Sequence, residues 1–103
     1  MDNINSVILA GTLVYDSILQ DNSDESPVCC CLIENVYRYK GKNGKIQDSS
    51  SCIDVEVEGR LGKKLYLVGK EGVKVRIIGR LKQVRDYRQV IIVAKHIEFL
   101  RCP

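Results

Sequence analysis

Residues 53–81 read IDVEVEGRLGKKLYLVGKEGVKVRIIGRL, and this stretch decides the fold. Its first six residues alternate apolar and acidic side chains. A period of two predicts a β-strand whose apolar set faces a core, with Asp54, Glu56 and Glu58 on the outer side.

The residues that follow change period. Residues 60–68 place apolar side chains three and four positions apart, which predicts a helix, and Gly69 and Gly72 follow as a stop signal. Three positions form its apolar side: Leu61, Leu65 and Val68. Residues 73–84 alternate again and predict a further strand. Its core side is predicted to consist of Val73, Val75, Ile77 and Leu81.

The rest of the chain adds strands on both sides of this unit. We predict a first strand at residues 6–13, bent at Gly11, a long second strand at 28–39, and a last strand at 89–100. The intervening segments are predicted as a connection at 16–27, a hairpin tip at 41–44 and a flexible segment at 48–51. One helix between the third and fourth of five strands is typical of the OB-fold barrel, and an SH3-like barrel would not place a full helix there.

Length and composition favour one small globular domain over residues 1–103. No apolar run is long enough for a membrane span, and no secretory signal is visible, so a cytoplasmic protein is expected. Charge is unevenly distributed: residues 1–58 carry 4 basic and 10 acidic side chains, and residues 59–103 carry 12 basic and 3 acidic ones. A strongly basic half favours a polyanionic partner, although it is also compatible with a solvated surface.

The five cysteines are interpreted as small apolar residues. An odd number without a secretory signal argues against a disulfide framework, and there are no C-x2-C pairs or accompanying histidines for a metal. On a strand, Cys29 and Cys31 should share one side and Cys30 the other. The sequence therefore predicts neither a metal site nor a cofactor.

Four blocks of the sequence carry a family resemblance: NSVILAGTL at residues 5–13 followed by Asp16, IDVEVEGRL at 53–61, YLVGKEGVKVRIIGRL at 66–81, and residues 92–99. They resemble the opening strand, the third strand with its helix, the YLxKGxxVxVxGxL block and the closing strand of bacterial single-stranded DNA-binding (SSB) proteins. The resemblance implies an OB fold, usually a homotetramer built from dimers. It further implies sequence-tolerant, non-catalytic binding of single-stranded DNA in replication, recombination and repair, in the nucleoid. The acidic tail with which the family recruits partner proteins is not present after Arg101.

Binding of single strands without sequence preference needs a basic groove for phosphates and flat side chains for bases. The candidates surround the predicted hairpin tip, begin the helix, line the fourth strand and flank the last turn. They are Tyr37, Arg38, Tyr39, Lys40, Lys42, Lys45, Arg60, Lys74, Arg76, Arg80, Lys82, Arg85, Tyr87 and Arg88. The stripe on the fourth strand is equally explained as the wet side of a sheet, and the tyrosines as packing at a sheet edge or subunit interface.

Two features depart from the family pattern. The positions where family members commonly carry aromatic side chains are occupied by Arg38, Cys52, Glu58 and Asp86. We expect Tyr37, Tyr39 and Tyr87 to substitute through a bulge or a register change, and Arg38 to stack through its guanidinium plane. The acidic row of the third strand would repel phosphate unless Lys or Arg side chains pair with it across strands.

The sequence thus supports a single-stranded DNA-binding protein first. The alternative is an OB-fold primosomal or protein-interaction adaptor with weak nucleic-acid binding, which the acidic row and the scarce aromatics favour. An enzyme is not expected, because no nucleophile–base pair, metal set or phosphate-cradling loop is present. The lone histidine, His96, is interpreted as a structural or interface residue.

Overall fold

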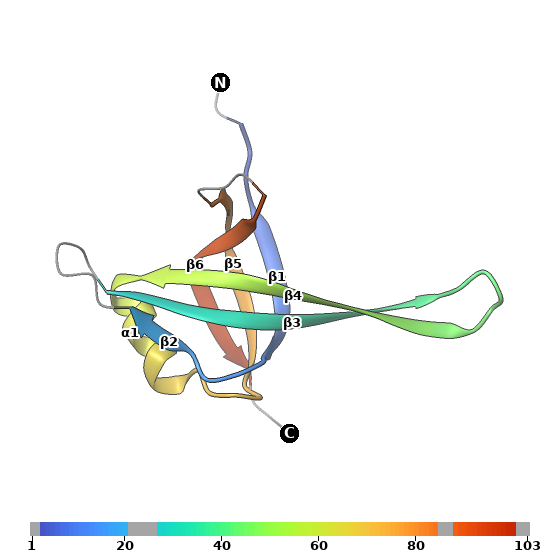
Figure 1. Cartoon of the computed structure of the whole chain (residues 1–103), viewed down its shortest axis with the longest axis horizontal. Coiled ribbons are helices and arrows are strands. Elements are labelled where there is room, and N and C mark those ends of the chain that lie inside the picture. The colour runs from blue at the N-terminus through green and yellow to red at the C-terminus, as the bar shows by residue number, and fades with distance from the viewer. Residues whose placement is uncertain (1–2, 21–26, 85–87, 101–103) are drawn as a thin grey trace.

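The chain is described by a computed structural model that covers residues 3–20, 27–84 and 88–100. Six strands and one helix follow one another along these described residues (Figure 1). Their bounds are β1 Val7–Leu13, β2 Ile18–Gln20, β3 Val28–Lys40, β4 Ile46–Glu58, α1 Gly59–Val68, β5 Lys74–Gln83 and β6 Val90–Leu100.

Five of the strands close into a barrel. The sheet order is β1-β5-β6-β4-β3-β2, and an additional pairing between β1 and β3 completes the ring. This seam is short, because only Thr12 and Leu13 pair with β3. The backbones come so close beside it that a Cβ at Gly11 would overlap the Glu34 carbonyl oxygen and the Ile33 side chain. Glycine at this position therefore permits closure, whereas the sequence had predicted a bend there.

The core follows from the alternation along β3, β4 and β5. Val55 and Val57 of β4 and Val75 and Ile77 of β5 are buried, as predicted. Cys29 and Cys31 enter the same core, while Cys30 lies on the outer side. Leu81 was predicted to be buried, but it is exposed, because the pairing of β5 with β1 ends at Gly79, two residues before it. Each of the buried core side chains stabilises the barrel by about 1.5–3 kcal/mol.

Helix α1 covers one end of the barrel. Gly59 begins it with φ 67°, a left-handed value that glycine adopts at little cost, and Leu65 inserts into the core. Ser17 of the β1–β2 connection donates from its hydroxyl to the Leu65 carbonyl at 3.0 Å, and its backbone N–H donates to the Gly69 carbonyl at 2.9 Å. The Leu65 carbonyl also accepts from the Gly69 N–H, so Ser17 adds a second donor there and supplies a partner for the Gly69 carbonyl at the helix end. Val68, predicted on the apolar side, is exposed instead.

Strands β3 and β4 continue beyond the barrel as a two-stranded arm, residues 35–51 (Figure 1). Residues 48–51 were predicted to be flexible, but they belong to β4 and pair with β3 in an unbroken register. The segment 16–27 was predicted to be a connection, yet Ile18–Gln20 forms β2, which pairs with the start of β3. In both places the partner strand supplies hydrogen bonds that local composition does not reveal.

Candidate nucleic-acid interface

One side of the arm carries a pair of aromatic rings. Tyr37 and Tyr39 are two residues apart on β3, so they point to the same side, and their ring centroids lie 6.2 Å apart with an interplanar angle of 18°. The Tyr39 hydroxyl donates to Gln47 Oε1 at 3.0 Å across the ladder, which fixes that ring. Tyr37 is 66% exposed. Its open π face is the kind of surface on which bases stack.

The register rules out the bulge that we expected to bring these tyrosines into position. Val28 through Lys40 pair continuously with Glu58 through Ile46, without a shift. Tyr37 and Tyr39 therefore lie on the side of the ladder opposite to Arg38. The guanidinium Nε of Arg38 donates to Asp48 Oδ1 on β4 at 3.0 Å, so this exposed ion pair engages the edge of the guanidinium plane.

Lysines surround the tip of the arm. Lys40, Lys42 and Lys45 are all exposed, within and beside the turn that joins β3 to β4. The turn is closed by the Gly41 N–H donating to the Lys45 carbonyl at 2.8 Å, and Gly44 takes φ 80°. The arm thus carries two tyrosine rings on one side and three exposed lysines at and beside its tip. That combination suits a flexible polyanion that also carries flat bases.

The other predicted cations do not join the arm. Arg60 lies on the first turn of α1, at the end of the molecule away from the arm (Figure 1). The β5 stripe is exposed as predicted, but Arg76 pairs with Glu98 at 3.1 Å and Lys82 with Glu56 at 3.7 Å. Lys74 and Arg80 are the other two members of that stripe, and Arg88 is exposed before β6. Arg85, Tyr87 and Asp86 lie outside the described residues.

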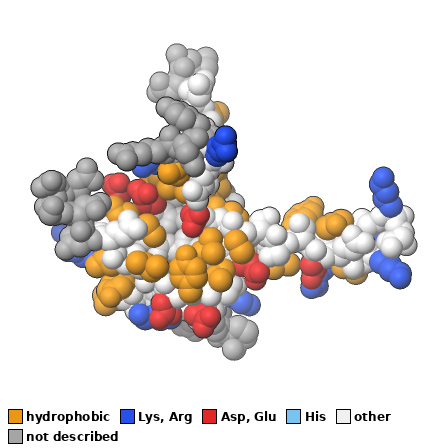
Figure 2. Space-filling view, viewed as in Figure 1, with side chains coloured by type: hydrophobic (Ala, Val, Ile, Leu, Met, Phe, Trp, Pro, Cys, Tyr) orange, Lys and Arg blue, Asp and Glu red, His pale blue; other side chains and the backbone are white. Residues whose placement is uncertain are grey.

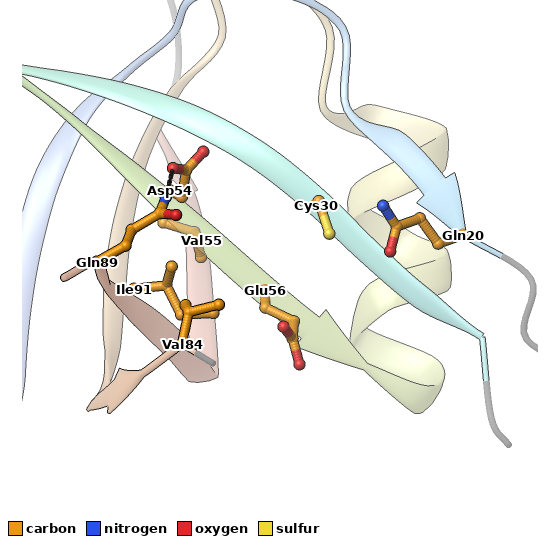
Figure 3. A pocket seen from close by; sticks show the side chains of 8 residues that line it. All are labelled: Gln20, Cys30, Asp54, Val55, Glu56, Val84, Gln89 and Ile91. Atoms are coloured by element: carbon orange, nitrogen blue, oxygen red, sulfur yellow. Dashed lines mark hydrogen bonds between the residues drawn. The ribbon is translucent and has the colours of Figure 1, made fainter. Parts of the chain in front are cut away.

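The acidic row of β4 points outward, as predicted, on the face between the arm and α1. Two side chains from other parts of the chain contact this row. Gln89 Nε2 donates to Asp54 Oδ2 at 2.7 Å, and Lys82 approaches Glu56. A shallow pocket of about 370 Å³ opens here between β4 and the approach to β6 (Figure 3). It is lined by Gln20, Cys30, Asp54, Val55, Glu56, Val84, Gln89 and Ile91.

The cysteines on β3 are not activated. Burial raises the pKa of the Cys31 thiol to about 12, with further contributions from Cys29, Cys30 and Asp54. Burial also raises the pKa of Cys29 and Cys30, although a hydrogen bond from Ser17 opposes the effect at Cys29. Nucleophilic or redox chemistry requires the thiolate, which these values disfavour. Cys52, in contrast, is exposed at the base of the arm opposite Glu34.

No group of three or more His, Cys, Asp and Glu side chains is placed to hold a metal ion within residues 3–20, 27–84 and 88–100. Within those ranges no helix is long and apolar enough to cross a membrane. His96 is exposed on β6 opposite Ile78.

Sequence reasoning overlooked two apolar side chains of the arm. Val36 and Ile46 lie on the side opposite the tyrosines, where Ile46 pairs with Lys40, and they are 53% and 72% exposed. The available signal was the alternation along β3, which puts Val36 on the same side as Arg38 and Lys40. It was concealed because the polar residues scattered along β4 show no matching pattern.

Comparison with known proteins identifies the fold of this chain. No known protein-family model matches the sequence, and no curated protein matches it in sequence. Solved structures do match: a Plasmodium falciparum SSB in complex with ssDNA has a TM-score of 0.84 at 12% identity, covering 98% of each chain. The chain has an OB fold. The five-stranded barrel with one helix before its fourth strand, as predicted, is thereby confirmed.

Two bacterial structures share this OB fold. A deletion variant of the single-stranded DNA-binding protein from Thermus aquaticus has a TM-score of 0.83 at 18% identity over 95% of this chain. A small single-stranded DNA-binding protein from Streptomyces coelicolor has a TM-score of 0.76 at 20% identity, covering 96% of this chain and 94% of its own. The present chain spans about half the length of the Thermus protein, 51%.

Proposed function

We propose that this OB-fold protein is a non-catalytic binding module for single-stranded DNA, which it contacts chiefly through the arm. The observation that carries the proposal is the exposed pair Tyr37 and Tyr39 beside Lys40, Lys42 and Lys45. Rings supply stacking to any base and ammonium groups supply charge to any phosphate, so binding is sequence-tolerant. Single-stranded intermediates of replication, recombination and repair in the nucleoid are the matching substrates.

The outer face of β4 limits the path of the strand. A phosphate backbone continuing from the arm across Asp54, Glu56 and Glu58 would meet carboxylates. Like-charge repulsion there disfavours extended wrapping over this face. The remaining predicted contacts, on β5, on α1 and beside the last turn, are secondary in this proposal, because two of the β5 cations already have carboxylate partners.

A homodimer, or a homotetramer of two dimers, is part of the proposal. Residues 7–11 of β1 pair with β5 on one side only, because the pairing with β3 begins at Thr12. Ile8 on this strand is 70% exposed. A groove of about 260 Å³ lined by Ala10, Gly11, Thr12, Glu34, Val36, Lys74 and Leu100 follows the open edge. An unpaired strand edge is a ready template for a strand of a second subunit.

The experiment is a fluorescence anisotropy titration of labelled oligo-dT at several salt concentrations. If Lys40, Lys42 and Lys45 contact phosphates, log K should fall against log salt with a slope of about −2. Tyr37→Ala should weaken binding by about 1–3 kcal/mol, roughly 5- to 150-fold, through lost stacking, whereas Tyr37→Phe should retain it. Tyr66→Ala is the matched control, because Tyr66 is exposed on α1 away from the arm.

Absence of binding at micromolar protein in low salt would contradict the proposal. The alternative adaptor function would then gain support. The acidic outer face of β4 favours it, and it predicts weak DNA binding with a tight protein partner.

A further inference from the structure

The outer face of β2, β3 and β4 combines apolar and acidic side chains. Cys30 pairs with Glu56 and Leu32 with Asp54, so each of these two has a carboxylate beside it, and Ile18 lies on the other side of Cys30. Figure 2 shows apolar side chains gathered on this face with acidic ones around them. We call the set Ile18, Cys30, Leu32, Asp54, Glu56 and Glu58 the acidic face.

The acidic face carries three carboxylates. Among the described residues, Lys82 approaches Glu56 at 3.7 Å, and the neutral amide of Gln89 donates to Asp54. Ile18 is 53% exposed. A surface on which exposed apolar groups alternate with excess negative charge is suited to a ligand that is apolar and positively charged.

The arm carries a surface of that chemistry. On the side opposite the tyrosines, Val36 and Ile46 are exposed, and cross-strand pairing places Lys40 beside Ile46. Arg38 lies between Val36 and Lys40 on the same side, and the tip adds two more lysines. We call the set Val36, Arg38, Lys40 and Ile46 the arm back.

The two surfaces cannot meet within one chain. Both are carried by β3 and β4, which pair in one unbroken register from Val28 to Lys40. The arm therefore extends away from the acidic face of its own molecule (Figure 1). The complementary arm back has to come from another copy.

We propose that the arm back of one copy docks on the acidic face of a second copy. Lys40 and the tip lysines then approach Asp54, Glu56 and Glu58, and Ile46 and Val36 cover Ile18 and Leu32. Because both surfaces lie on one ribbon, two antiparallel ribbons can exchange both contacts about a two-fold axis. The contact does not depend on DNA, and it leaves the Tyr37–Tyr39 side of the arm open.

The test is sedimentation velocity of the protein without DNA, at low salt and at about 1 M salt, where the Debye length is about 3 Å. The average mass of the wild type should fall about twofold at high salt, as expected for a two-fold contact between charged surfaces. Two variants should show the high-salt mass already at low salt. They are the double variant Glu56→Lys/Glu58→Lys and, separately, Ile46→Ser. Leu67→Ser is the matched control for Ile46→Ser, because Leu67 is 74% exposed on α1.

A charge swap separates docking from misfolding. The double variant Arg38→Glu/Lys40→Glu, on its own, should not associate. An equimolar mixture of this variant with Glu56→Lys/Glu58→Lys should associate again. Carbodiimide cross-linking of the wild type followed by peptide mapping should join an arm lysine to an acidic-face carboxylate. A wild-type mass that does not change with salt, or a mixture that stays dissociated, would overturn the proposal.

The outcome is independent of the proposed function. Glu56→Lys/Glu58→Lys should still bind oligo-dT, because neither carboxylate belongs to the arm. Loss of association with retained DNA binding supports both inferences. A wild type that associates as described but does not bind oligo-dT supports the docking and overturns DNA binding alone.

Discussion

At the scale of single residues, three consecutive cysteines, residues 29–31, illustrate what alternation on a strand does to identical side chains. Cys29 and Cys31 are buried in the barrel core, whereas Cys30 lines the outer pocket beside Asp54 and Glu56. Alternation alone predicted this division from the sequence. It could not predict how deeply each cysteine is buried, because that depends on the neighbouring strands β4 and β2.

The buried Cys31 thiol makes stability dependent on alkaline pH. Its pKa rises to about 12 in the folded chain, from 9.0. Above pH 9 the unfolded chain releases this proton and the folded chain keeps it, so folding stability is lost as pH rises. The free energy of unfolding should fall by up to about 1.4 kcal/mol per pH unit from this group. Denaturant titrations between pH 8 and pH 11 measure the slope.

Variants assign the slope to this thiol. Cys31→Ala should lower stability at every pH because it leaves a cavity, but its slope above pH 9 should be shallower than in the wild type. Cys52→Ala, on the exposed base of the arm, should keep the wild-type slope. Equal slopes in the Cys31→Ala variant and the wild type would contradict this prediction.

At the scale of elements, the arm is a two-stranded ladder without a core. Apart from Asn35 and Gly41, its residues are exposed, and it is held by cross-strand contacts such as Arg38–Asp48 and Tyr39–Gln47. The turn and the first strand of this hairpin were predictable from Gly41, Gly44 and the apolar and aromatic residues of β3. The second strand was not, because the run QDSSSC at residues 47–52 has no strand pattern of its own.

Excision of the arm should separate folding from binding. Replacing residues 36–50 with Asn-Gly leaves a tight hairpin between Asn35 and Ser51, which are already paired. Since little is buried in the arm, the free energy of unfolding should change by no more than about 1 kcal/mol. Oligo-dT binding should be lost. A variant that unfolds, or one that binds as tightly as the wild type, would show that the arm has a different role.

At the scale of the whole molecule, the sequence predicted the barrel better than the site. Several features of the sequence favour the same closed barrel, and they therefore agree with one another. They are the period of the helix, the order of the strands and the glycines at positions 11 and 59. The site depends on which side of a long ribbon each residue takes. The expected register shift of Tyr37 and Tyr39 was wrong for that reason, and the partners of Glu56 and Asp54 come from distant parts of the chain.

The proposed subunit contact along β1 belongs to this scale. Ile8→Lys places a charge on an exposed side chain of the open edge, where a two-fold contact would bring two copies of it together. The mass measured by light scattering in high salt should fall by about half, without loss of stability. Leu67→Lys on α1 should leave the mass unchanged. A wild type that is strictly monomeric would refute the contact.

The position of β6 in the barrel has a consequence during synthesis. β6 pairs with β5 and, in parallel, with β4, so it is the strand that joins the two halves of the sheet. On the ribosome, the β3–β4 hairpin is local in sequence and can form early, but its apolar inner side lacks the core side chains of β6 until residues 90–100 have emerged. A nascent chain arrested before Val90 would therefore carry a finished arm on an open, aggregation-prone half-barrel.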